Sequence, residues 1–219
     1  SMVISFVIRA QSDTGGGAVL FASTLGQGKQ QYREEVAFSA ISTPGTGISV
    51  FHSDRTSAEA NVFFGVAYLR RSFNVDYGSS GLGGGYTTSA RVDMDMLYFS
   101  CGPEFRAAKS GKLSFRFGPL IGIHAGGTMS GVTQGWSIGT NGSRTYFQGE
   151  EPTMFQCDLR LMFGFSHRAM LNETIGWNID PGLHFALSSM MEDYRTRGVD
   201  LVISVGLFWR SSRSLIPRM

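Results

Sequence analysis

The sequence predicts an all-β protein, specifically an antiparallel, up-and-down transmembrane β-barrel of about eight strands, with ten as the alternative count. Three observations lead to this prediction. Five successive segments alternate large apolar residues with small or polar ones, long and short connections alternate between them, and no run of about 18 apolar residues is present. Without a transmembrane helix, a chain spans a bilayer only as a closed barrel, because lipid offers no partners to an open sheet edge.

The amino-acid composition differs from that of a soluble protein with a charged surface. Only 16% of the 219 residues are charged, below the roughly 25% of soluble proteins, and 29 are glycine. Lysine, which soluble surfaces carry freely, occurs only at Lys29, Lys109 and Lys112. The 19 basic and 17 acidic residues give a net charge of +2, which excludes the dense basic patch of a nucleic-acid-binding protein.

The chain length fits one domain. Residues 1–10 are either the end of a cleaved secretory signal peptide or a first strand, because their apolar run ends at Ile8-Arg9-Ala10. Residues 11–219 are expected to form a single barrel.

The first strands are the least regular. We expect strands at 47–53 and within 16–25 or 35–42, followed by an extended segment at 60–77 whose adjacent Arg70 and Arg71 break the alternation.

The later strands alternate clearly, and each presents a bulky apolar face. These five segments are 92–100, 113–124, 155–166, 175–188 and 199–210. A soluble, lipocalin-like barrel would turn that face inward and cover its exterior with Lys and Glu. The opposite faces here are instead rich in Gly, Ser and Ala, so the apolar faces are expected to contact lipid.

The small-residue faces also carry charges of both signs, which we expect to form a luminal network of ion pairs. Its predicted members are Asp93, Asp95, Arg116, Asp158, Arg160, Asp180, His184 and Asp200. In this interpretation Val92, Met94, Met96 and Tyr98 face lipid.

The connections predict the two sides of the membrane. Short links at 107–112 and 168–174 are expected to be periplasmic, and the long 126–152 segment is expected to be an external loop. The Gly-rich link at 78–89 is also interpreted as a loop. Trp177 and Trp209 then fall at one membrane interface, where aromatic girdles are found.

The sequence gives only weak indications of catalysis or metal binding. Asp93 and Asp95 near His124 or His184 would suit acid–base catalysis, but ion pairing with Arg116 or Arg160 is the simpler interpretation. The four histidines are scattered singly, so we expect no metal site, no cofactor and no catalytic residues.

Two segments are typical of a known family: Val199-Asp-Leu-Val-Ile-Ser-Val-Gly-Leu-Phe-Trp-Arg210 and Phe117-Gly-Pro-Leu-Ile-Gly122. Together with the strand spacing from Ala90 onward, they resemble the small porin-like β-barrel proteins of the outer membrane, which are typically eight-stranded. The resemblance implies location in the outer membrane of a Gram-negative bacterium and contact with membrane lipid and lipopolysaccharide.

Three function classes follow. The favoured one is a structural or interaction protein, whose largely plugged barrel presents external loops to a protein or surface polymer. The alternatives are a narrow channel or binder for a small solute or lipid, and a membrane-embedded hydrolase.

Overall fold

The structure is a computed structural model, and it describes residues 9–25, 37–57, 59–107, 112–139, 142–150, 157–188 and 198–214. Nine strands make up the regular structure of these residues. They are β1 (Arg9–Leu25), β2 (Ala37–Arg55), β3 (Ala60–Gly81), β4 (Gly84–Arg106), β5 (Leu113–Ser137), β6 (Ser143–Glu150), β7 (Cys157–Met170), β8 (Ile175–Ala186) and β9 (Gly198–Ser214). Within the described ranges, no helix has the length and apolarity needed to cross a bilayer.

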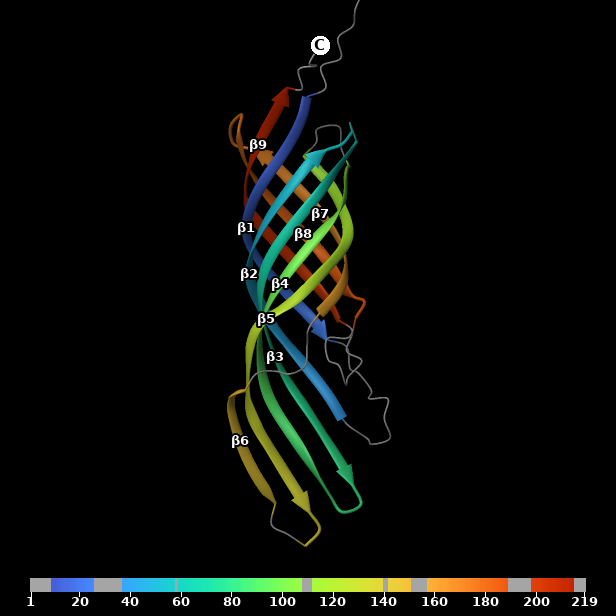
Figure 1. Cartoon of the computed structure of the whole chain (residues 1–219), viewed down its shortest axis with the longest axis vertical. Coiled ribbons are helices and arrows are strands. Elements are labelled where there is room, and N and C mark those ends of the chain that lie inside the picture. The colour runs from blue at the N-terminus through green and yellow to red at the C-terminus, as the bar shows by residue number, and fades with distance from the viewer. Residues whose placement is uncertain are drawn as a thin grey trace, which may run out of the picture.

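Eight of these strands close into a barrel (Figure 1). The order is β4-β3-β2-β1-β9-β8-β7-β5, and pairing of β4 with β5 completes the ring. The first and last strands pair antiparallel from Arg9 with Ser214 to Leu25 with Gly198. The prediction of an all-β, antiparallel barrel is confirmed, with eight strands in the wall rather than ten.

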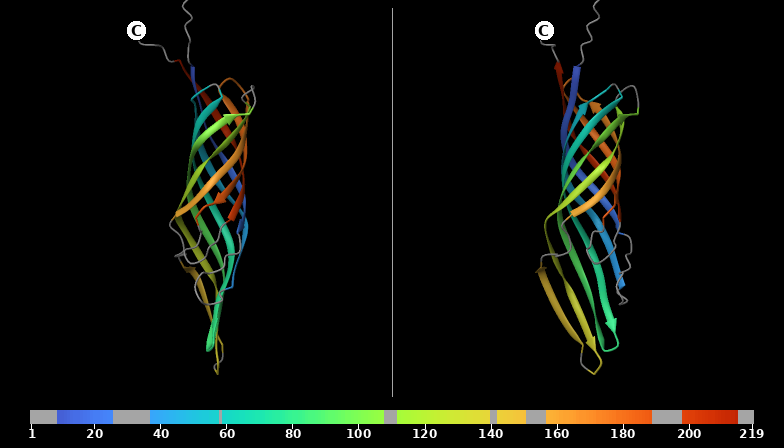
Figure 2. Two further views of the ribbon diagram at one scale, coloured as in Figure 1. Left: turned by 90° about the vertical axis from the view of Figure 1, so that its right-hand side faces the viewer. Right: turned by 45° about the vertical axis from the view of Figure 1, so that its right-hand side comes forward.

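The two ends of the barrel differ, as both views in Figure 2 show. The successive strands β2 and β3, β4 and β5, and β7 and β8 are connected at one end, called the short-turn end, where β1 also begins and β9 ends. At the opposite end β3, β4 and β5 continue well past the barrel, the start of β2 pairs with β3 as far as Gly78, and β6 pairs with β5. We call residues 72–81, 84–95, 126–137 and 143–150 the extension.

The extension corrects two predictions from the sequence. Much of the segment that was expected to be a long loop is strand. Residues 126–137 form the end of β5 and residues 143–150 form β6, and Gly139, with a φ of 81°, lies in the turn between them. Most of the 78–89 link is also strand, because β3 and β4 pair up to Gly81 and Gly84. The glycine and serine content that favoured loops is compatible with strands whose neighbours supply the hydrogen bonds.

The upstream strands are longer than predicted. Segments 35–42 and 47–53 belong largely to one strand, β2, with a register shift between Thr43 and Thr46. Segment 16–25 lies in β1, as do Arg9 and Ala10; residues 1–8, the rest of the ambiguous N-terminal stretch, lie outside the described residues.

Prolines lie where the wall pairing is interrupted. Pairing of β7 with β8 stops between Gly164–Gly182 and His167–Ile179, where Pro181 lacks an N–H group, although Pro181 still pairs with Ile203 of β9. The β4–β5 ladder skips the stretch that contains Pro103 and Pro119.

Candidate functional site

The outer surface of the barrel wall is apolar. On β9 the outward side chains are exposed and large, with Leu207 at 57%; they are Leu201, Ile203, Val205, Leu207 and Trp209. The outward residues Ile175, Leu183 and Phe185 on β8 and Phe117, Ile121 and Ile123 on β5 continue this surface around the barrel. We call it the apolar belt.

The belt has the height of a bilayer core. Ten residues separate Val199 from Trp209, which at about 3.3 Å per residue and a tilt of about 40° is about 25 Å along the barrel axis. Transmembrane barrels have apolar bands of about this height, whereas soluble monomers rarely expose apolar patches of more than a few hundred Å². The chain is a transmembrane β-barrel.

The two predicted interfacial tryptophans border the belt near the short-turn end. Trp209 is 55% exposed and pairs in register with Ile175, and Trp177 pairs with Leu207 on the neighbouring strand. The indole of Trp177 packs against His167, with ring centroids 5.3 Å apart. Both therefore face outward at one level. The third tryptophan, Trp136, lies in the extension and is half exposed.

The lumen near the short-turn end is filled by ion pairs that we call the short-turn cluster. Arg168 donates to Asp13 at 3.0 Å and to Glu104 at 3.1 Å, while the Ser53 and Ser114 hydroxyls donate to Glu104 at 2.8 and 2.6 Å. Three carboxylates and three guanidinium groups balance in it. Its charged members are Asp13, Glu104, Arg116, Arg168, Asp180 and Arg210.

A second group, the far-rim cluster, lies where β7 and β9 begin and β8 ends. Arg160, fully buried, donates to Asp158 at 2.5 Å and to Asp200 at 2.7 Å, and Arg71 also pairs with Asp200. The Tyr98 hydroxyl donates to Asp158 at 2.7 Å. Two acids and two arginines balance here as well. Buried ions are stable only when paired in this way.

Six of the eight residues predicted for the luminal network thus lie inside the barrel: Arg116, Asp158, Arg160, Asp180, His184 and Asp200. The network also contains five charged residues that sequence reasoning missed: Asp13, Arg71, Glu104, Arg168 and Arg210.

Asp93 and Asp95 were placed wrongly. They lie on the outer face of β4, where Asp93 accepts from Ser72 and forms an ion pair with the exposed Arg91 at 3.4 Å. The alternate residues Val92, Met94 and Met96 point inward and are at most 1% exposed. The acid–base pair considered above therefore does not form. His184 lies inside the barrel and His124 pairs with the inward Met96, whereas these carboxylates lie on the outer face.

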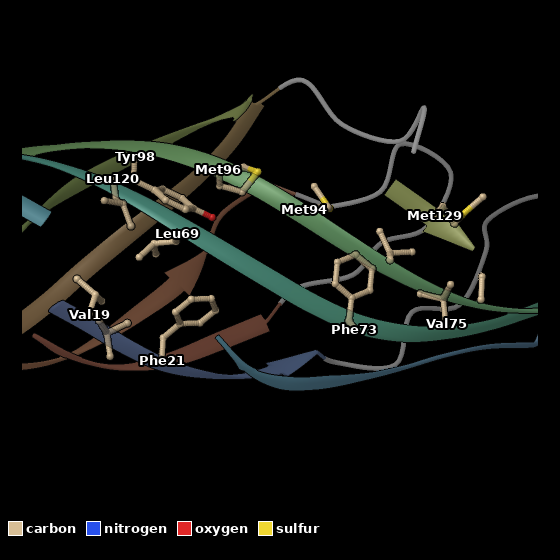
Figure 3. Packing of buried hydrophobic residues seen from close by; sticks show 13 residues of the cluster. Val19, Phe21, Leu69, Phe73, Val75, Met94, Met96, Tyr98, Leu120 and Met129 are labelled. Atoms are coloured by element: carbon tan, nitrogen blue, oxygen red, sulfur yellow. The ribbon is translucent and has the colours of Figure 1, made fainter. Parts of the chain in front are cut away.

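The inner face of the extension is apolar. Phe73 and Val75 of β3 pack with Val92 and Met94 of β4 and with Met129 of β5 (Figure 3). The outer face is polar, with Asn74, Asp76, Ser89, Arg91 and Asp93. The same strands that carry apolar side chains outward in the belt thus carry them inward in the extension.

No protein-family model and no curated protein matches the chain. Among solved structures, Ail of Yersinia pestis, crystallised with the heparin analogue sucrose octasulfate, shares 14% identity over 92% of this chain and 99% of its own, with a TM-score of 0.43. OprG of Pseudomonas aeruginosa shares 13% identity over 92% of this chain and 95% of its own, with a TM-score of 0.44. The barrel assignment rests on the closed sheet and its apolar belt.

Proposed function

We propose that this chain is an outer-membrane barrel whose role is to hold the extension outside the cell for contact with a protein or a surface polymer. The observation that carries the proposal is the reversal of polarity along β3, β4 and β5. An apolar exterior suits lipid, and a polar exterior over an apolar inner face suits water. In this orientation the short-turn end is periplasmic.

The filled lumen argues against a wide pore. An eight-stranded barrel is just wide enough for its interior to be filled by side chains, and here two charge-balanced clusters occupy it. We expect the refolded protein to show no steady conductance in planar bilayers.

The distal extension favours an uncharged partner. Residues 77–90 and 125–143 contain no Asp, Glu, Lys, Arg or His. Trp136 is 50% exposed and Tyr146 is 69% exposed, with the guanidinium of Arg144 5.1 Å from the Tyr146 ring. Aromatic side chains of this kind anchor many interfaces, whereas a strongly anionic polymer would require several basic groups.

Lipid contact is the second part of the proposal. The belt would lie in the hydrocarbon core, and Arg70 and Arg91, exposed just beyond it, would lie at the level of lipopolysaccharide headgroups.

Binding of the barrel in nanodiscs to a panel of protein, neutral polysaccharide and sulfated polysaccharide surfaces tests the role. Replacing both Trp136 and Tyr146 by alanine is expected to weaken binding more than about tenfold, since an anchor residue contributes about 2 kcal/mol or more. Leu171→Ala, at an equally exposed position on the short-turn end, is the matched control and is expected to change nothing. Binding that survives loss of both aromatics, or discrete conductance steps without any binding, would contradict the proposal.

A further inference from the structure

A girdle of small residues encircles the lumen between the two ion-pair clusters. Six strands each turn a glycine or serine inward at this level, and together these residues line one cavity: Ser49, Gly65, Ser100, Gly164, Gly182 and Ser204. The cavity has a volume of about 120 Å³. Barrel interiors of this width are normally filled by side chains, so six small residues at one level create space that larger ones would fill.

Polar atoms without partners among the described residues border this cavity. Arg116 and His184 line it and are each 8% exposed, yet the Arg116 Nη2 and the His184 Nδ1 have no hydrogen-bond partner there. The same is true of Asp180 Oδ1. The Arg116 guanidinium is held between the rings of Phe51 and Phe63, at 5.3 and 5.5 Å. Buried polar groups are normally satisfied, so these atoms indicate a bound molecule.

The charges around the cavity determine whether it favours a charged or a neutral molecule. The short-turn cluster on one side and the far-rim cluster on the other each balance their acids and arginines. An ion entering between them would be a buried charge without a counter-ion, which is costly. A neutral molecule that accepts from Arg116 and donates to Asp180 has no such cost.

We propose that the girdle lines a binding chamber for one small neutral molecule that carries both a hydrogen-bond donor and an acceptor. Apolar side chains of Leu120, Met162 and Val202 complete the lining and suit a methyl group. Water molecules, short primary amides and short alcohols share this chemistry, and a cavity of about 150 Å³ holds a molecule as large as benzene. The inference is independent of the role of the extension.

Acetamide is the probe, followed through the arginine side-chain NMR signals of the refolded, full-length protein in nanodiscs. Acetamide is expected to shift the signals of the Arg116 guanidinium group saturably, while acetate, which has the same size and a full charge, is not. This comparison needs only the unmodified protein. No saturable shift with acetamide, or an equal shift with acetate, would overturn the proposal.

A matched pair of variants locates the site. Ala67 lines the chamber and Ala18 lies on the outer face of β1, so Ala67→Leu fills the cavity and Ala18→Leu does not. We expect A67L to weaken acetamide binding about tenfold or more, because the leucine side chain would occupy the volume that the amide needs. Retained binding in folded A67L, or its loss in A18L, would place the amide elsewhere and refute the chamber.

Discussion

The barrel and the extension are built from the same strands with opposite polarity. Within the belt, β4 turns Phe99 and Phe105 outward and buries Glu104; further along, it buries Val92 and turns Asp93 outward. The strand alternates in the same way throughout, and only the solvent changes. Where lipid surrounds the wall the apolar side faces out, and where water surrounds it the apolar side faces in.

This difference explains the main error of the sequence prediction. Period-two alternation identifies two faces but does not say which one is outside. The rule that the apolar face meets lipid holds for 199–210, a strand that lies within the belt over its whole length. It fails at 92–100, which crosses from the belt into the extension, so Asp93 and Asp95 were placed in the lumen.

The largest expected loss of stability comes from breaking an ion pair inside the barrel. Arg160→Met leaves Asp158 and Asp200 with an unpaired buried charge, so the free energy of unfolding in urea should fall by about 3–5 kcal/mol. Arg91→Met removes an ion pair on the exposed face of the extension, where we expect a loss of about 0–1 kcal/mol. Equal losses in the two variants would mean that the luminal pairs are not buried from water.

The next effect concerns the apolar inner face of the extension. Met94 is 1% exposed, so Met94→Ala should lower the free energy of unfolding by about 2–4 kcal/mol. Its neighbour Asp93 points outward, and Asp93→Ala should cost less than about 1 kcal/mol. The two values would be reversed if the parity of β4 were the one predicted from the sequence.

A third effect, of similar size, depends on depth in the bilayer. Ile203 lies near the middle of the belt and Val199 at its edge. We expect Ile203→Arg to cost about 2–4 kcal/mol and Val199→Arg about 0–1 kcal/mol for the protein refolded into lipid vesicles. A flat profile along β9 would argue that this face does not meet lipid.

The sequence predicted strands and their faces correctly where the apolar face of a strand lies in the apolar belt. The segments 113–124 and 199–210 lie within β5 and β9, and 175–188 covers β8 and passes its end by two residues; the outward residues of all three are apolar. It missed β6, because Ser143–Glu150 is exposed along almost its whole length and pairs only with β5 among the described residues. Such a strand has no apolar periodicity to detect.

The missed luminal charges have separate causes. Arg168 was assigned to a turn but belongs to β7, and Glu104 lies beyond residue 100, where the predicted segment ended, although β4 continues to Arg106. Arg71 stands next to Arg70, and neighbouring residues on a strand point to opposite faces, so only one of the two enters the lumen. The adjacent pair was itself a signal, since one member had to face inward.

The most direct test of the reversed polarity uses the three tryptophans. In single-tryptophan variants refolded into vesicles, fluorescence from Trp177 and Trp209 should be quenched by lipids that carry a quencher near the headgroup. Fluorescence from Trp136 should be quenched only by a water-soluble quencher. Lipid quenching of Trp136, or purely aqueous quenching of Trp209, would contradict a barrel that lies in lipid and an extension that stands in water.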